Sequence, residues 1–525
     1  FALGLPSTLE GIIGSRIDRL TQGQQLTLKA ASVIGRAFTH FLLRAVHPIA
    51  GERALLPRQL ETLTQLDLTL LDPGVGDADA YLFKHVVTQE TAYNLLLFAQ
   101  RRQLHQVIAE WYERNFAGDL TPYRGLLAHH WVRAEVPAKA MDALEKAGEQ
   151  ALQSHANSEA ADFFAQALHI GSTEHVPMPR RAHWELLRCE ALYKIGRFEE
   201  SLVGARHVSA LLGHPVPETP LRRVTGTLKA LARVLVRRQA PRMPIVRSDS
   251  GDQRLLEAAQ AHGIVISVSF WAADALTMMY ATITCVDLAE RFGPCSVLVR
   301  GYAGMALVLG VVPLHSLARA YGAKAVALGE AIGDADSLAF ARFLCGLYLS
   351  GAGRLDEAAA QLKLAFEDYE RLGDGRRFED ASNVYSSVLY YQGHWSMATT
   401  VAEEGHQSAK RRGDPQSIVA PLILTAIMLA RRGDHEGALR AFLRIPLAPG
   451  DHVSRIDVQG EIALLYVQLG RFEDARVAAE EVAGLLSGRR PATVGVLVGT
   501  LAFAEACREL WVRAVKLGLP EAPSL

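Results

Sequence analysis

The chain of 525 residues lacks the sequence patterns that carry most known catalytic chemistry. Ten lysines are present and none follows a glycine, so the Gly-Lys-Ser/Thr core of a phosphate-binding P-loop is missing. The HExxH, GxSxG and EF-hand patterns are missing as well. We therefore expect no catalytic residues and no cofactor-binding site of its own in this chain.

Cysteine and histidine are too scattered to predict a metal site or a disulfide framework. The five cysteines are odd in number and include no CxxC pair, so neither paired disulfides nor a zinc ribbon is predicted. Buried thiols in a reducing cytosol are the simpler expectation. The adjacent pair His129-His130 falls in a helical pattern, where neighbouring side chains point apart. We expect this pair to be packed or solvated rather than to bind a metal.

Neither an excess of one charge nor a long apolar run is present. The formal net charge is −1, so the molecule as a whole has no electrostatic attraction to nucleic acid. The most apolar stretch, Ile264 to Tyr280, is interrupted by Asp274 and is too short to cross a bilayer. We therefore expect a cytoplasmic protein. Because the first residue is Phe1 rather than methionine, we also expect the chain to be a piece of a longer protein.

The sequence does contain a regular spacing of glycines. Gly333, Gly373 and Gly413 follow one another at intervals of 40 residues. A further glycine stands 20 residues after each of these, near the middle of the repeat: Gly353, Gly393 and Gly433. Between glycines the apolar residues recur at helical spacing, and a glycine just past a helix end supplies the left-handed residue that other side chains resist. Two such stops in every repeat predict two helices joined by tight turns.

The second helix of each repeat begins with its own pattern. A bulky residue usually stands two positions after the mid-repeat glycine, as at Leu355, Trp395 and Phe472, and an alanine stands five positions after it. The bulky side chain is expected to fill the gap beside the helix, and the alanine to let the two helices approach closely. At GRFEESL, GRLDEAA and GRFEDAR the chain resembles tetratricopeptide repeats, and another helical hairpin array is the alternative. Either array stacks into a solenoid with a long concave surface.

Residues 1–118 do not follow the repeat. Helical patterns cover residues 9–20, 22–34, 38–46 and 57–66. The short strands expected at 68–71 and 81–83 then flank a turn at 73–77 that contains proline and glycine. Helices followed by a β-hairpin are typical of a winged-helix domain.

Winged helices often bind DNA, but the charges here oppose that function. The helix that would enter the major groove carries Arg58 as its one cation, beside Glu61. The turn of the hairpin carries Asp77 and Asp79. Because affinity for a duplex comes mainly from phosphate neutralisation by several cations, we expect no nucleic-acid binding.

The sequence thus predicts an all-α protein: an N-terminal winged-helix-like domain with a small β-hairpin, followed by a tetratricopeptide-like α-solenoid. The expected parts are a winged-helix-like domain at 1–118, first helical hairpins at 119–215, a basic amphipathic helix with a linker at 216–252, repeats of about 40 residues at 253–488, and a capping helix at 489–525. We expect a protein or peptide to bind the concave face of the solenoid.

Residues 5–170 resemble the segment that follows the ATPase core in bacterial multidomain signalling proteins. The resemblance is carried by LPSTLEGIIGSRIDRL, LKAASVIGRAF and FKHVVTQETAYNLLLFAQRRQLHQVIAEWYE, and by LAHHWVRAEVPAKAMDALEKAGEQAL at the start of the repeats. Such proteins join a class III adenylate/guanylate cyclase domain, or sometimes a protein kinase, to an AAA/STAND-type ATPase and a tetratricopeptide tail. The resemblance implies that the cyclase and ATPase domains lie upstream and that ATP or ADP binds there.

The resemblance singles out one histidine. In STAND ATPases a histidine at the place that matches His85 contacts the phosphates of bound ADP and holds the closed state. The Met-His-Asp of that family reads Phe83-Lys84-His85-Val86 here, so the flanking pattern departs from the family. The resemblance implies a phosphate contact for His85, and Lys84 beside a helix start could also offer donors. The alternative is that His85 only begins a helix and packs on the hairpin.

A basic amphipathic helix is predicted within residues 221–247, which contain eight cations and no acid. One helical stripe is apolar: Leu221, Val224, Leu228, Leu231 and Leu235. The cations largely opposite it are Arg222, Lys229, Arg233 and Arg237. Such a helix binds an anionic membrane or an acidic partner surface. The alternative is that the stripe packs on neighbouring repeats while the cations are solvated or paired, with Pro241 to Gly251 as a linker.

These patterns favour a regulatory and protein-interaction segment of a multidomain signalling ATPase. Ligand binding to the solenoid would shift an open/closed equilibrium and so control an upstream cyclase or kinase domain. The alternatives are the sensor arm of an ATPase-type transcription activator and a free-standing scaffold. Beyond residue 489 one helix is expected, at 493–516, which leaves little room for a terminal DNA-binding domain.

Overall fold

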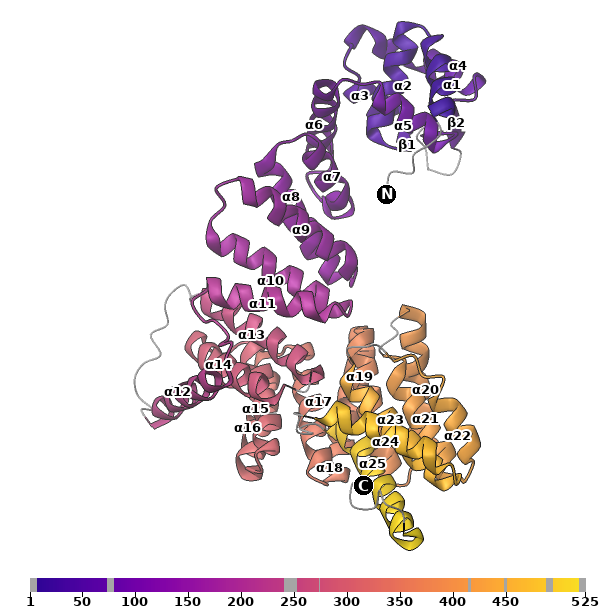
Figure 1. Ribbon diagram of the computed structural model, residues 1–525. Coiled ribbons are helices and arrows are strands. Elements are labelled where there is room, and N and C mark those ends of the chain that lie inside the picture. The colour runs from indigo at the N-terminus through magenta and orange to yellow at the C-terminus, as the bar shows by residue number, and fades with distance from the viewer. Residues whose placement is uncertain are drawn as a thin grey trace. The chain divides into compact units, whose positions relative to one another are not determined.

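The computed structural model describes residues 7–72, 80–239, 253–272, 274–413, 417–447, 451–487 and 494–518. These residues are almost entirely helical (Figure 1), which confirms the predicted all-α class. The chain divides into two compact units, Phe1–Val176 and Pro177–Leu525. In the described parts of the chain, every helix falls short of the length or apolarity that a bilayer-crossing segment needs. The domain boundaries predicted at 118, 215, 252 and 488 stay predictions.

The N-terminal unit begins with helices around a small sheet. Its first elements are α1 (Ser7–Asp18), α2 (Gln22–Ile34), β1 (Ala37–Thr39), α3 (His40–Val46), a 3-10 turn (Ala50–Ala54), α4 (Leu56–Gln65), β2 (Thr69–Asp72), β3 (Ala80–Phe83), α5 (Val86–Asn94) and α6 (Phe98–Asn115). Helix α2 begins at a capping box, in which Thr21 and Gln24 each accept a hydrogen bond from the other's backbone N–H.

The three strands form an antiparallel sheet in the order β1-β3-β2. Leu70 of β2 lies opposite Leu82 of β3, which confirms the predicted hairpin; the turn at 73–77 lies outside the described residues. The helix predicted over 38–46 is wrong at its start, because Ala37–Thr39 forms strand β1. The Thr39 hydroxyl accepts a hydrogen bond from the N–H of Leu42 and so caps α3, which begins at His40.

One apolar core holds these elements together. Ile17, Leu28, Leu43 and Leu60 are fully buried on α1, α2, α3 and α4, and Phe83 of β3 packs in the same cluster. Each such side chain contributes about 1.5–3 kcal/mol when it leaves water. The sheet therefore closes one side of a helical core rather than forming a layer of its own.

Helical hairpins complete the N-terminal unit. Its remaining elements are a 3-10 turn (Thr121–Tyr123), α7 (Arg124–Arg133), α8 (Pro137–Gln153) and α9 (Asn157–Thr173). Helices α8 and α9 approach closely where Gly148 faces the ring of Phe164. A Cβ at Gly148 would lie 2.7 Å from that ring, so a larger residue would force the two helices apart.

The C-terminal unit is a series of helical hairpins with an additional helix, α12, after the first hairpin and a terminal helix, α25. Its elements are α10 (Met178–Lys194), α11 (Phe198–Leu211), α12 (Pro220–Gln239), α13 (Gln253–Trp271), α14 (Ala275–Phe292), α15 (Ser296–Val311), α16 (His315–Ile332), α17 (Ala335–Gly351), α18 (Leu355–Leu372), α19 (Gly375–Tyr391), α20 (Trp395–Arg412), α21 (Val419–Arg431), α22 (His435–Phe442), α23 (His452–Gln468), α24 (Phe472–Leu486) and α25 (Val494–Leu517).

The repeat turns have the geometry that the glycine spacing predicts. Gly333 and Gly373 end their helices at φ values of 74° and 70°, in the left-handed region. The alanines five positions after the mid-repeat glycines are fully buried, as predicted: Ala358, Ala398, Ala438 and Ala475. The role expected for the bulky residue holds only in part, because Leu355 packs against the core while Trp395 is 50% exposed.

Successive hairpins stack through their first helices. Helix α10 contacts α13, and contacts then run from α13 to α15, from α15 to α17 and onward to α19, α21 and α23. These helices therefore share one surface of the C-terminal unit, which we call the first-helix face. Helix α25 packs on α23, and the two backbones touch where Gly460 meets Gly499.

Candidate functional site

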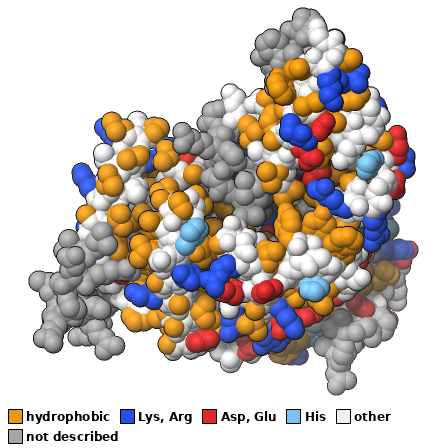
Figure 2. Space-filling model, turned by 90° about the horizontal axis from the view of Figure 1, so that it is seen from below, with side chains coloured by type: hydrophobic (Ala, Val, Ile, Leu, Met, Phe, Trp, Pro, Cys, Tyr) orange, Lys and Arg blue, Asp and Glu red, His pale blue; other side chains and the backbone are white. Residues whose placement is uncertain are grey.

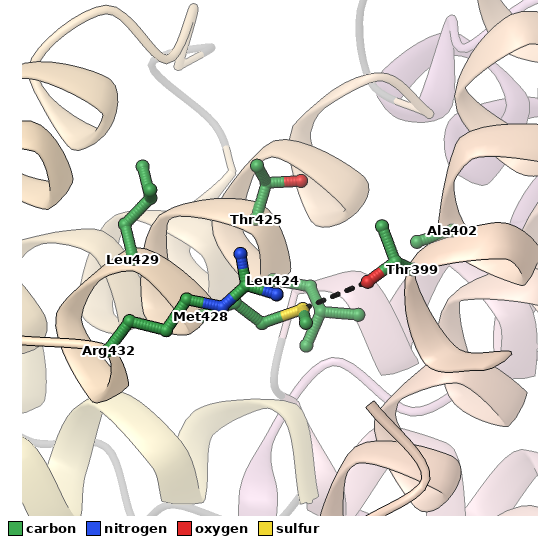
Figure 3. Close-up of a pocket in the computed structure, with 7 residues that line it drawn as sticks. All are labelled: Thr399, Ala402, Leu424, Thr425, Met428, Leu429 and Arg432. Carbon is green, nitrogen blue, oxygen red and sulfur yellow. Dashed lines mark hydrogen bonds between the residues drawn. The ribbon is translucent and has the colours of Figure 1, made fainter. Parts of the chain in front are cut away.

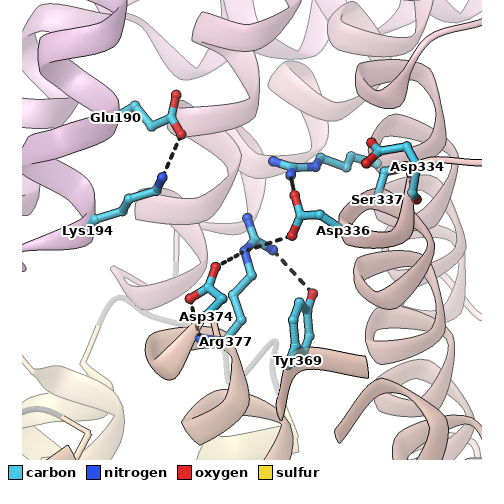
Figure 4. A network of polar contacts seen from close by, with 9 residues as sticks. Glu190, Lys194, Asp334, Asp336, Ser337, Tyr369, Asp374 and Arg377 are labelled. Atoms are coloured by element: carbon cyan, nitrogen blue, oxygen red, sulfur yellow. Dashed lines mark hydrogen bonds and ion pairs between the residues drawn. The ribbon is translucent and has the colours of Figure 1, made fainter. Parts of the chain in front are cut away.

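A cluster of charged and aromatic side chains lies on the first-helix face (Figure 4). Arg300 comes from α15, Asp336 from α17 and Arg377 from the first turn of α19. We call the whole group the Arg300–Arg377 cluster: Arg300, Asp336, Phe340, Tyr369, Asp374 and Arg377. Because its members come from consecutive hairpins, the stacking of the repeats assembles it.

Arg377 is the centre of the cluster. Its Nε lies 4.0 Å from a carboxylate oxygen of Asp336 and 3.5 Å from one of Asp374, as Figure 4 shows. Its Nη1 lies 3.5 Å from the Tyr369 hydroxyl. The other carboxylate oxygen of Asp336 accepts a hydrogen bond from Arg300. Two guanidinium groups thus share one carboxylate.

Phe340 lies beneath both guanidinium groups. The Cζ atom of Arg377 lies 4.7 Å from the centroid of the Phe340 ring, and that of Arg300 lies 5.5 Å from it. A cation over an aromatic face is attracted by the ring quadrupole, which fixes the planes of both guanidinium groups. The two side chains are therefore held in place before any ligand arrives.

The electrostatics of the cluster keep its acids charged. Although burial favours the neutral acid, Arg300 and Arg377 hold the pKa of Asp336 below its ordinary value. Burial raises the pKa of Tyr369 to about 12, so its hydroxyl stays protonated. The Nε atom of Arg300 is buried and has no hydrogen-bond partner among the described residues. A buried donor without an acceptor is costly, which points to an acceptor supplied by a ligand.

Glu190 and Lys194 of α10 face the same cluster. Lys194 pairs with Glu190 at 2.9 Å, one helical turn apart (Figure 4). Burial opposes the charge on Glu190, but Lys194, Arg300 and Arg377 together hold its pKa below the ordinary value. Arg300 and Arg377 thus lower the pKa of Glu190 on α10, although several hairpins separate them from it along the chain. The electrostatic field of the cluster therefore extends to α10.

On one face of the molecule, charges of both signs lie side by side. On the face seen in Figure 2, basic and acidic side chains lie interspersed among hydrophobic ones. The Arg300–Arg377 cluster itself also balances its cations with acids. The cluster therefore offers individually placed donors and acceptors rather than a strong net field.

A small cavity lies between α20 and α21 (Figure 3). Its volume is about 90 Å³, and its lining is Thr399, Ala402, Leu424, Thr425, Met428, Leu429 and Arg432. The Thr399 hydroxyl donates a hydrogen bond to the Met428 sulfur at 3.6 Å. A space of this size holds a few water molecules at most, so we interpret it as a packing gap.

The two residues implied for phosphate sensing lie at the end of the hairpin. His85 precedes the first turn of α5 and is exposed. Lys84 forms an ion pair with Asp67 at 2.8 Å. The hydrogen bond from Lys84 holds the pKa of Asp67 below its ordinary value. Lys84 is thus engaged within the domain, while His85 presents its imidazole to solvent at a helix N-terminus.

The histidine pair of α7 belongs to a cluster that the sequence did not reveal. His130 is buried, and its Nδ1 lies 2.8 Å from the Nδ1 of His105 on α6. The Nε2 of His105 lies 3.1 Å from the Tyr93 hydroxyl. Burial lowers the pKa values of both buried histidines to about 3, so both are neutral at pH 7. The prediction that these neighbours point apart is wrong, because the centroid of the exposed His129 ring lies 5.4 Å from that of His130 and 5.7 Å from that of His105.

The predicted basic helix exists as α12, but its packing differs from the expected one. Ala230 and Val234 are buried, whereas Leu221 and Leu228 of the predicted apolar stripe are 74% and 60% exposed. Arg233 forms an ion pair with the buried Asp287 at 2.8 Å. Arg222 and Lys229 are exposed. The side chain of Arg237 and the linker after α12 lie outside the described residues.

The Arg300–Arg377 cluster is not evident from the sequence patterns considered above. Its partners stand about one repeat apart along the chain, so no short motif contains them. The signal that could have found them is the position of charges just after the Gly-Asp pairs. Asp336 follows Gly333-Asp334, and Arg377 follows Gly373-Asp374 at nearly the same register one repeat later.

Comparison with known sequences shows likeness in part of the chain. No family model matches the chain. It is 32% identical to the uncharacterized protein R02095 of Rhizobium meliloti over 164 residues, which are 31% of this chain and 16% of that protein. The matched stretch is thus a small part of that relative's length, and the activity of a whole protein of this kind is a matter for proposal.

Similar solved structures have low sequence identity to the chain. One similar structure is a Rap protein complexed with Competence and Sporulation Factor. The alignment includes 75% of this chain and 99% of that chain, at 14% identity and a TM-score of 0.49. Another is a STAND protein with a tetratricopeptide repeat sensor from Pyrococcus horikoshii. That alignment includes 99% of this chain and 67% of that chain, at 10% identity and a TM-score of 0.40. At these values the likeness concerns architecture and assigns no function to this chain.

Proposed function

We propose that this chain is a regulatory and protein-interaction segment of a multidomain signalling ATPase, and that its first-helix face binds a peptide or a segment of a protein. The observation that carries the proposal is the Arg300–Arg377 cluster. It presents two pre-oriented guanidinium groups on the first-helix face, and one of them has a buried Nε without an acceptor among the described residues.

The ligand that fits this cluster carries a carboxylate. Guanidinium groups bind carboxylates through parallel hydrogen bonds, which are stronger than those between neutral groups. Asp336 now takes that place between Arg300 and Arg377. A peptide with an acidic side chain or a free C-terminus would share these donors with Asp336, while an apolar neighbour in the peptide contacts Phe340.

Ligand binding at this place would regulate by closing the concave face. A peptide that contacts α10 on one side and α15 to α19 on the other stabilises the more tightly curved form of the solenoid. We propose that this shift is passed to an upstream ATPase that binds ATP or ADP, and from there to a nucleotide cyclase or kinase domain. The N-terminal helices and their sheet would act as the winged-helix domain of that ATPase, in the cytoplasm.

Peptide display on the intact chain tests the proposal. Peptides selected on the wild-type protein should contain an acidic residue near an aromatic or aliphatic one. In fluorescence anisotropy, Arg377→Ala and Arg300→Ala should each weaken binding by at least about tenfold, since each removes a charged hydrogen bond. Arg371→Ala is the matched control, because Arg371 lies on α18 and is 72% exposed in its pair with Asp368. Equal affinity for all three variants contradicts the proposal.

The contact with an upstream ATPase has its own test. We propose that His85, rather than the ion-paired Lys84, reaches toward a nucleotide phosphate. In the longer protein that contains the ATPase, His85→Ala should reduce the amount of ADP retained after purification, and Lys84→Ala should reduce it less. Unchanged ADP retention in the His85 variant contradicts this assignment.

A further inference from the structure

Helix α12 packs on the C-terminal unit through its small residues. Ala230 and Val234 are each 1% exposed. A Cβ at Gly226 would lie 2.8 Å from the ring of Tyr280 on α14, so the helix lies close against that ring. These three residues recur every four positions and form one side of α12. Leu231 of the leucine stripe packs against the same core, but Leu221, Val224 and Leu228 do not belong to the packed side.

The first part of the leucine stripe of α12, from Leu221 to Leu228, faces outward. Leu221, Val224 and Leu228 are 74%, 43% and 60% exposed. Their spacing of three and four residues places them in one line along two turns of the helix. Single exposed apolar residues need no explanation, but a continuous stripe of aliphatic side chains on a well-packed helix marks an interaction surface.

Cations flank the exposed stripe. Arg222 and Lys229, each one position after a leucine of the stripe, are exposed. Two other cations are used internally, since Arg223 pairs with Asp274 and Arg233 with Asp287. The sequence from 221 to 247 contains no acidic residue. The outward side of α12 is therefore apolar along its centre and positive along its edge.

We propose that the outward side of α12 docks on an anionic lipid surface, with Leu221, Val224 and Leu228 among the acyl chains and Arg222 and Lys229 at the headgroups. A helix that lies in the membrane interface needs this arrangement of one apolar stripe and adjacent cations. The charge on the helix complements anionic lipid. An exposed helix side enters a fluid interface without a preformed groove, which a folded protein partner would have to supply. The proposal is independent of the peptide site on the first-helix face.

Vesicle sedimentation with the full chain tests the proposal. The protein should sediment with vesicles of equal parts phosphatidylcholine and phosphatidylglycerol at low salt, and at least about tenfold less with phosphatidylcholine alone. Raising the salt to 0.5 M should release it, because screening removes the attraction of the headgroups for the cations. Sedimentation that is equal with both vesicle types, or absent with both, overturns the proposal.

Paired variants identify the surface. The double variants Leu221→Asp with Leu228→Asp, and Arg222→Glu with Lys229→Glu, should each lower vesicle binding at least about tenfold. Val477→Asp is the control, because Val477 of α24 is 60% exposed and lies outside α12. Circular dichroism should show all variants folded, since the altered side chains face outward. Wild-type binding by both double variants overturns the proposal. A concentration-dependent dimer that the leucine variant abolishes, without vesicle binding, also overturns it and assigns the stripe to a second copy of the chain.

Discussion

Replacing Glu379 by alanine should loosen the hairpin that presents Arg377. Glu379 is fully buried on α19 and accepts two hydrogen bonds from Arg412 of α20, both at 2.9 Å, and one from Ser408 at 2.8 Å. Removing one partner of a buried ion pair typically costs about 3–5 kcal/mol, because the remaining charge loses its compensation. Arg412 is 32% exposed and can regain water. We therefore expect the low end, about 3 kcal/mol.

Native-state hydrogen exchange measures this effect where it occurs. A loss of about 3 kcal/mol raises the opening equilibrium of α19 and α20 by roughly 150-fold, since 1.4 kcal/mol is tenfold. Lys363→Ala is the control, because Lys363 is 62% exposed in its pair with Glu367. Its effect should stay below about 0.5 kcal/mol. If both variants exchange alike, the ion pair does not stabilise the hairpin and this reasoning fails.

Further predictions concern helix packing and pH. Gly499→Ala should lower the melting temperature, because a Cβ there would lie 2.3 Å from the backbone of Asp457; Gly484→Ala, in open space, should leave it unchanged or raise it. The unfolded chain protonates His105 and His130 near pH 6.5, but burial keeps the folded pKa values at about 3. Urea denaturation should therefore show stability falling as the pH drops from 6.5 toward 3, and less steeply in His130→Gln. Burial raises the pKa of Asp457 well above its ordinary value, so the folded chain keeps this acid protonated while the unfolded chain releases the proton near pH 4. Asparagine has no proton to release, so Asp457→Asn should stabilise the protein increasingly as the pH rises above 4. A Gly484 variant as destabilised as the Gly499 one, or pH profiles unaffected by these substitutions, would contradict these arguments.

The periodic part of the fold could be predicted because it is encoded locally. Gly333 and Gly373 adopt the left-handed conformation that ends a helix, and Ala358 and Ala398 are buried where two helices meet. Each of these roles depends on neighbours within a few residues. The strand at Ala37–Thr39 could not be predicted in the same way, because its partner β3 lies more than 40 residues further along the chain.

The candidate site could not be predicted because contacts between repeats create it. Arg300 and Asp336 meet only when α15 stacks on α17, and Arg300 and Arg377 lower the pKa of Glu190 although α10 lies several hairpins earlier in the chain. Amphipathicity misled the prediction for α12. Its leucine stripe looked like the buried side, but only Leu231 of the described stripe packs, whereas Gly226 and Ala230 permit a closer approach to α14.

Photo-cross-linking tests the central claim, that the first-helix face binds a peptide, most directly. A benzoylphenylalanine in place of Phe340 would lie between the two guanidinium groups, and the same residue in place of Leu364, which is 39% exposed on α18, would lie on the second helix of a hairpin. The display-selected peptide should cross-link to the protein from position 340 and not from position 364. Cross-linking from position 364 alone, or equally from both positions, would contradict the claim.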